Sequence, residues 1–200
     1  MLKEELLFEI YKGKIHLPLH KEELNEHKDV YDVGLVYGEI TKVGVESLVK
    51  HLKKLNLFEN INFIDLGSGN GRLVLHMGLY DEVKKSSGVE LYKSKSDFGK
   101  KMINGLSGYP KEKVNLVNCD INEFNDFFEY NLIFNNMIQP LNGGGILSEV
   151  SSKIKRGTHL VSTFQFIECG KYGFELVSRP EIVYSWMVGR EIKSYLYVKI

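Results

Sequence analysis

Asp65-Leu66-Gly67-Ser68-Gly69-Asn70-Gly71 directly follows the apolar run Ile61-Asn62-Phe63-Ile64. This order is typical of a strand that enters a glycine turn and then a helix, because glycine lets the backbone turn sharply and approach a ligand where a Cβ would collide. The spacing differs from the dinucleotide fingerprint G-x-G-x-x-G. The third glycine comes one residue early, and Arg72 stands where the fingerprint has glycine. A glycine turn in any strand–helix unit gives a similar pattern, so the stretch needs support from elsewhere in the chain.

That support comes from acidic residues that close two further strand-like runs. Glu90 ends the run Ser87-Gly88-Val89, about twenty residues after the glycine turn, where open parallel sheets place an acid against a ribose hydroxyl. Asp120 follows the run from Val114 to Asn118. Together with Asp65, these residues place acids at the ends of three successive predicted strands. The pattern indicates a site for a cofactor that contains adenosine.

Composition is that of one compact, enzyme-sized domain. The chain has 200 residues, of which 43% are hydrophobic, enough to bury one sizeable core. Cys119 and Cys169 are too few for a disulfide framework and lack the clustering of a metal site, which favours a reducing, intracellular compartment. No apolar run approaches the length of a membrane span, and the charged start is unlike a signal peptide. The formal net charge of zero argues against a chain-wide electrostatic attraction to nucleic acid.

The charges are distributed unevenly. Residues 1–40 carry five lysines and nine acids, a net of −4, and the other 160 residues carry 21 basic and 17 acidic residues, a net of +4. We therefore predict a short acidic N-terminal cap with a cofactor-covering loop over residues 1–40, followed by the catalytic domain over residues 41–200. The cap contains His16, His20 and His27, but no cysteine or second cluster accompanies them. These histidines are interpreted as solvated surface, and no metal site is predicted.

Regular alternation of apolar patterns predicts an α/β fold: a mostly parallel twisted sheet with helices on both faces. Thr41 is a candidate N-cap for a helix that runs to about Leu55. Strands are expected over 61–65, 86–90, 113–118, 132–134 and 158–164, and helices over 2–10, 21–28, 70–80, 92–106, 122–128 and 144–154. The tail departs from the alternation. Its strand-like runs 174–178, 182–186 and 192–198 predict a closing antiparallel meander.

The glycine motif D-x-G-x-G-x-G resembles motif I of the class I S-adenosylmethionine (SAM) methyltransferases, which place the acid near the amino-acid end of the cofactor. A larger set of motifs resembles the Dot1 family of histone lysine methyltransferases. In chain order these motifs are Val36-Tyr37-Gly38-Glu39-Ile40-Thr41, the Asp-Leu-Gly-Ser-Gly turn, Gly88-Val89-Glu90, Phe134-Asn135-Asn136-Met137, Ser185-Trp186 and Ser194-Tyr195. The resemblance covers about residues 36–200. The family usually has phenylalanine where Met137 stands and an aromatic residue where Ile121 stands.

This resemblance implies a role for each matching residue. Asn135 would face both the transferred methyl group and the lysine amine, while Phe134, Trp186 and Tyr195 would wall the channel that admits the lysine. Residues implied in SAM binding are Tyr37, Glu39, Thr41, Asp65, Gly67, Gly69, Gly71, Glu90, Asp120, Ile121 and Asn135. The chemistry fits a lysine substrate, whose amine has a pKa of about 10.4 in water and must lose its proton before it can attack. A narrow aromatic channel would favour the neutral amine by desolvating the ammonium group.

Other interpretations remain open at this stage. Trp186 and Tyr195 lie on predicted strands and could be ordinary core residues. Nucleic-acid amino methyltransferases place Asn/Asp-Pro-Pro-Tyr/Phe after the fourth strand, and this chain has neither the prolines nor the ring there. A small-molecule methyltransferase is the main alternative, and a SAM-binding module without catalysis is a further one. The favoured substrate is a histone or another basic protein, on its own or in a nucleosome, in the nucleus or in viral or host chromatin.

Known eukaryotic members of the family carry a long basic extension that binds nucleosomes, and no such extension is found here. Weak contact with DNA would then depend on patches of exposed positive charge, and no membrane partner is expected. The expected oligomeric state is a monomer. The candidate patches are Lys84-Lys85, Lys93, Lys95, Lys100-Lys101 and Lys153-Lys155-Arg156, although solvated helix faces produce similar runs.

Overall fold

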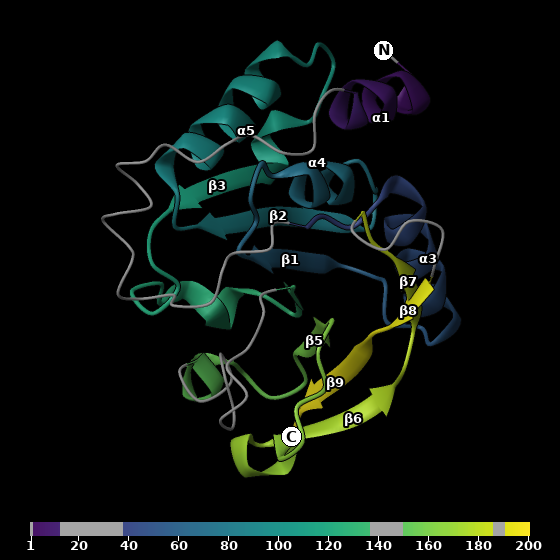
Figure 1. The fold of residues 1–200 in the computed structure, drawn as a ribbon, viewed down its shortest axis with the longest axis vertical. Coiled ribbons are helices and arrows are strands. Elements are labelled where there is room, and N and C mark those ends of the chain that lie inside the picture. The colour runs from purple at the N-terminus through teal and green to yellow at the C-terminus, as the bar shows by residue number, and fades with distance from the viewer. Residues whose placement is uncertain (1, 13–37, 137–149, 186–190) are drawn as a thin grey trace.

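The computed structural model describes residues 2–12, 38–136, 150–185 and 191–200. One mixed sheet forms the centre of this part of the chain, with strand order β3-β2-β1-β4-β5-β9-β6 (Figure 1). Its strands are β1 (Ile61–Leu66), β2 (Val83–Glu90), β3 (Val114–Asn118), β4 (Leu132–Asn135), β5 (His159–Ser162), β6 (Phe174–Ser178) and β9 (Tyr195–Lys199). Strands β1 to β5 are parallel, and β9 runs antiparallel to both β5 and β6. The predicted parallel sheet with an antiparallel C-terminal end is thereby confirmed.

The order of the strands reverses between β1 and β4, because β2 and β3 lie on one side of β1 while β4 and β5 lie on the other. Open α/β sheets bind ligands at the carboxyl ends of the strands beside such a reversal, where the connections diverge and leave a crevice. Asp65 and the glycine turn lie at that end of β1, and Glu90 is the last residue of the neighbouring β2.

Three α-helices cover one face of the sheet: α3 (Lys42–Lys54), α4 (Arg72–Gly78) and α5 (Lys93–Gly105). Val45, Leu48 and Leu52 repeat at helical spacing along α3, and they pack against the sheet residues Phe63 and Phe134. The opposite face is covered by side chains in or beside short 3-10 helices at 126–129, 151–153 and 169–172, namely Phe127, Ile154, Phe166, Cys169 and Tyr172.

Two sequence predictions about individual elements were wrong. The segment expected as a helix over 122–128 forms only the 3-10 helix Asp126–Glu129. Before it, the Asp120 carboxylate accepts a hydrogen bond of 2.8 Å from the Asn122 amide, a local turn that competes with helix formation. The run expected as one strand over 192–198 is divided at Ser194. Strand β8 (Glu191–Lys193) pairs instead with β7 (Glu181–Val183) in a separate two-stranded sheet.

Helix α1 (Lys3–Tyr11) belongs to the body of the molecule (Figure 1). Its apolar residues Leu6 and Ile10 pack against Leu75 of α4 and against Tyr109. The predicted helix over 21–28 and most of that over 144–154 lie outside the described residues, and the division of the chain near residue 40 stays a prediction. None of the helices in the described ranges is long and apolar enough to cross a membrane.

Candidate functional site

The glycine turn has a backbone that suits glycine at three positions. Gly67, Gly69 and Gly71 have φ angles of 78°, 54° and 77°, which are left-handed values that side chains disfavour. A Cβ at Gly71 would also lie 3.0 Å from Leu116 of β3. The turn is fixed by strand β2, because the amides of Gly67 and Ser68 donate to the Val89 carbonyl at 2.9 and 3.0 Å. Its shape is therefore set by the sheet.

Glu90 joins the glycine turn to the end of β2. One carboxylate oxygen accepts a hydrogen bond of 2.7 Å from the Gly69 amide, and the other accepts one of 2.9 Å from the Tyr92 amide. The side chain is buried. The position of Glu90 at the end of β2 is the one where open parallel sheets place an acid against a ribose hydroxyl, and this role stays a prediction.

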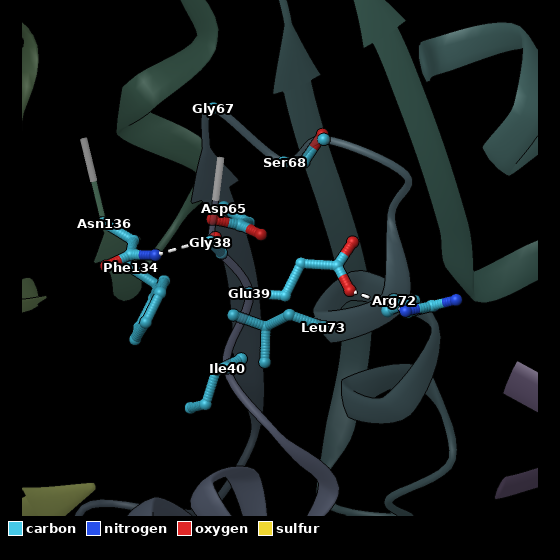
Figure 2. A pocket seen from close by; sticks show the side chains of 11 residues that line it. Gly38, Glu39, Ile40, Asp65, Gly67, Ser68, Arg72, Leu73, Phe134 and Asn136 are labelled. Carbon is cyan, nitrogen blue, oxygen red and sulfur yellow. Dashed lines mark hydrogen bonds and ion pairs between the residues drawn. The ribbon is translucent and has the colours of Figure 1, made fainter. Parts of the chain in front are cut away.

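A pocket opens beside the glycine turn (Figure 2). It is lined by Gly38, Glu39, Ile40, Asp65, Gly67, Ser68, Gly69, Arg72, Leu73, Phe134 and Asn136. Asp65 is 5% exposed. Burial raises the pKa of its carboxyl well above the usual value, and the nearby Glu90 and Glu39 carboxylates raise it further. A buried acid of this kind is stabilised in its charged form by a cationic ligand group.

Arg72 and Glu39 form an ion pair at the side of the pocket. The Arg72 Nη1 lies 2.8 Å from Glu39 Oε2, and the two side chains are 3% and 13% exposed. Figure 2 shows Glu39 extending from the segment after Gly38 towards Arg72 at the start of α4. Sequence reasoning noted Arg72 only as a departure from the dinucleotide fingerprint. Its position directly after the third glycine was the available signal for a residue of the site.

The pocket wall formed by residues 38–40 is attached to the C-terminal part of the chain. The Glu39 amide donates to Ser185 Oγ at 3.0 Å, and the Ser185 amide donates to the Glu39 carbonyl at 2.8 Å. Thr41 does not line the pocket. Its hydroxyl donates to the Val183 carbonyl at 2.9 Å and accepts from the Gly44 amide at 3.0 Å, which caps α3 as predicted.

The two adjacent asparagines at the end of β4 occupy different positions. Asn136 lines the pocket, and its side-chain amide donates to the Gly38 carbonyl at 3.1 Å (Figure 2). Asn135 is the last residue of β4, is fully buried and lies outside the pocket lining. Sequence reasoning singled out Asn135 and missed Asn136, although the adjacent asparagines were visible as a motif.

Register places the predicted channel residues on both faces of the sheet. Phe134 pairs with Asp65 and lines the pocket. Asn135 pairs with Ser162, and Ser162 pairs with Tyr195, so Asn135 and Tyr195 share the other face because paired residues point the same way. Asn135 and Tyr195 thus lie on the same face of the sheet, with strand β5 between them.

The remaining predicted residues lie away from the pocket or outside the residues that the structure describes. Asp120 and Ile121 follow β3, two strands from β1, and Ile121 packs in the core of the opposite face. Tyr37, Trp186, Met137 and the three histidines of the N-terminal segment lie outside the described residues. Within the described ranges, no three histidine, cysteine, aspartate or glutamate side chains are grouped to hold a metal ion. The roles assigned to individual side chains stay predictions.

Comparison with known proteins shows which protein family the chain matches. The model of the family described as "Histone methylation protein DOT1" matches residues 14–182. A curated relative, the "Histone-lysine N-methyltransferase, H3 lysine-79 specific" of Caenorhabditis elegans, is 36% identical over 90 residues, which is 45% of this chain and 9% of the relative. The aligned part therefore spans less than a tenth of that relative's length.

Solved structures show the fold. The magnesium protoporphyrin IX methyltransferase of Synechocystis PCC 6803 with bound SAM has a TM-score of 0.61 at 13% identity, covering 98% of this chain and 91% of that one. The RNA methyltransferase of Salinibacter ruber in complex with S-adenosyl-L-homocysteine has a TM-score of 0.55 at 19% identity, covering 79% and 92%. The sheet is that of the class I methyltransferases, as predicted.

The ion pair at the pocket gives a first prediction. In the Arg72→Met variant the Glu39 carboxylate loses the guanidinium group of its ion pair. We therefore expect a loss of about 3 kcal/mol in the free energy of unfolding. Adding Glu39→Gln removes the carboxylate charge that faced Arg72 and should recover part of that loss. Urea unfolding of wild type, both single variants and the double variant measures the coupling. Additive losses would show that the two side chains do not stabilise the fold as a pair.

Proposed function

Because the chain belongs to the DOT1 family of histone methylation proteins, we propose that it transfers a methyl group from SAM to a lysine amine of a histone or histone-like protein. One observation carries this proposal. The segment Gly38–Ile40, which belongs to the Dot1-like motif Val36-Tyr37-Gly38-Glu39-Ile40-Thr41, lines the same pocket as Asp65 and the glycine turn. All the residues that line this pocket lie within the matched range 14–182, and the pocket is at the carboxyl end of the parallel strands, which supports the proposal.

The residues of the pocket fit the amino-acid end of SAM. Asp65 and Glu39 place two carboxylates where the cofactor's ammonium group would bind, and Arg72 places a cation within the same lining. Gly69 and Glu90 fix the turn that would lie beneath the ribose, while Asp120 would accept a hydrogen bond from the adenine amino group. When bound, SAM supplies an electrophilic methyl group on a sulfonium. The protein's task is to align this group with the incoming amine and to exclude water.

Activation of the lysine would depend on the surroundings of the amine. The ammonium form cannot attack, and its transfer into an aromatic channel lowers the lysine pKa by desolvation. Phe134 lines the cofactor pocket, and Tyr195 lies on β9, two strands away from β4. Because Phe134 and Tyr195 point to opposite faces of the sheet, a channel that they form with Trp186 would have to cross the carboxyl edge of the strands. Asn135 would orient the amine through its side-chain amide, and bulk water would take the released proton.

A protein substrate in chromatin is the natural target for a member of this family, and we place the enzyme in the nucleus or in viral or host chromatin. Exposed lysines such as Lys84, Lys100 and Lys101 would contribute weak contact with DNA. Residues 1–40 would act as an acidic cap over the cofactor. A few phosphate contacts give only weak binding at physiological salt, because the electrostatic contribution grows with the number of phosphates neutralised, so recognition of the protein surface would decide the substrate.

Activity on separate substrate pools tests the proposal. Labelled SAM is incubated with histones, nucleosomes, free amino acids, small metabolites and RNA, and we expect label in a lysine of a histone. Asn135→Ala should lower turnover by more than it raises the dissociation constant of the cofactor. Label only in a small metabolite would establish the small-molecule alternative. Full histone activity of Asn135→Ala would refute the role given to that residue.

The raised pKa of Asp65 predicts a pH dependence of cofactor binding. Below this pKa the carboxyl is protonated and neutral, so binding of the cofactor's ammonium group must release a proton. Affinity for S-adenosylhomocysteine should therefore fall as the pH decreases below the Asp65 pKa, by up to about tenfold per pH unit, and should level off above it. Calorimetry across pH measures this dependence, with Asp65→Asn as the control. Equal pH dependence in both proteins would exclude Asp65 as the group responsible.

A further inference from the structure

A connected chain of polar side chains runs from the pocket to the C-terminal strands. Asn136 donates to the Gly38 carbonyl at 3.1 Å, and its side-chain oxygen accepts a hydrogen bond of 2.5 Å from Thr163 Oγ1. The Thr163 hydroxyl lies 3.3 Å from the Tyr184 hydroxyl, which lies 2.8 Å from Ser194 Oγ. The four side chains, here called the polar relay, come from four segments, of which those with Tyr184 and Ser194 are ten residues apart.

The relay connects elements that lie beside the proposed cofactor pocket with the strand that carries Tyr195. Asn136 and Thr163 are the residues that follow β4 and β5, at the carboxyl ends of those strands. Tyr184 forms an isolated backbone bridge with Ile40, which belongs to the pocket lining. Ser194 directly precedes β9, whose first residue is Tyr195. One end of the relay is therefore bonded to Gly38 in the wall of the proposed cofactor pocket. The other end directly precedes β9, whose first residue Tyr195 is a predicted residue of the lysine channel.

Burial makes this connection energetically significant. Thr163, Tyr184 and Ser194 are 8%, 1% and 0% exposed. A buried hydroxyl that loses its partner keeps the cost of desolvation, which exceeds the net gain of an ordinary hydrogen bond. In a low-dielectric environment such a network also fixes geometry more strongly than separate bonds do. A shift of Gly38 away from Asn136 would break the hydrogen bond between the Gly38 carbonyl and the Asn136 side-chain amide, which is the pocket end of the relay.

We propose that Asn136, Thr163, Tyr184 and Ser194 are positioning residues that fix the pocket wall at Gly38 and couple cofactor binding to the strand carrying Tyr195. This inference rests on the proposed function for the identity of the two ligands. The relay itself touches the pocket only through Asn136. Thr163, Tyr184 and Ser194 act on the pocket through Asn136 and through the backbone bridge between Tyr184 and Ile40.

The test removes single hydroxyl groups and keeps the shape of each side chain. Thr163→Val and Tyr184→Phe are compared with Thr158→Val and Tyr109→Phe. These controls also lose a buried hydroxyl, since Thr158 Oγ1 donates to the Tyr130 carbonyl at 3.1 Å and the Tyr109 hydroxyl donates to the Leu75 carbonyl at 2.7 Å. Neither control residue lines the pocket. Thermal melts of all four variants give the general cost of losing one buried hydroxyl.

Calorimetry with S-adenosylhomocysteine is the decisive measurement. We expect both relay variants to raise its dissociation constant about fivefold or more, while both controls leave it within twofold at comparable losses of melting temperature. Thr163→Ser, which keeps the hydroxyl, should restore binding. If relay and control variants bind equally well, the relay has only a structural role and the proposal is overturned. If Thr163→Val does not fold, Tyr184→Phe against Tyr109→Phe decides the question by the same criterion.

Coupling has a separate readout. In assays on the lysine substrate, Tyr184→Phe should raise the KM for SAM and the KM for the substrate together, whereas an effect on the KM for SAM alone would refute the coupling to β9. Binding of S-adenosylhomocysteine needs no methyl acceptor. Loss of binding in the relay variants would therefore support the relay even if no lysine substrate were methylated, and the two proposals fail separately.

Discussion

The hydrogen bond from the Gly69 amide to the Glu90 carboxylate is the interaction on which the arrangement of the site depends. It joins the turn after β1 to the end of β2, and it forms because parallel strands bring their carboxyl ends to one edge of the sheet. The same edge collects Asp65 and Glu39, so three acids and Arg72 occupy one small region. Such a concentration of negative charge is costly without counter-charge. Arg72 supplies one cation, and the ammonium and sulfonium groups of SAM would supply more.

Much of this was predictable from the sequence because the signals are local. The glycine spacing predicted the left-handed turn, Thr41 was identified as the cap of α3, and the strand-end acids Glu90 and Asp65 predicted the ligand edge. Hydrophobic periodicity also sufficed for the parallel sheet and its antiparallel end. Each of these features is determined by a few neighbouring residues and by the general rules for packing helices on a sheet.

Features that depend on distant partners were missed. Nothing near Arg72 in the sequence indicates that it pairs with Glu39, which lies 33 residues away. Choosing between Asn135 and Asn136 needs the register of β4 against β1 and β5, because adjacent residues of a strand point to opposite faces. The break at Ser194 arises because its amide donates to the Pro180 carbonyl at 2.8 Å and its side chain reaches Tyr184. Sequence spacing alone contains none of these contacts.

The central claim is that the glycine turn and its acids form a SAM site and not a dinucleotide site, and calorimetry with the unmodified 200-residue chain tests it most directly. The account predicts that S-adenosylhomocysteine binds with a dissociation constant in the micromolar range, roughly −8 kcal/mol, and that NAD does not compete. Glu90→Ala should weaken this binding tenfold or more, because both the ribose contact and the support of the glycine turn are lost. Tighter binding of NAD than of S-adenosylhomocysteine would contradict the account.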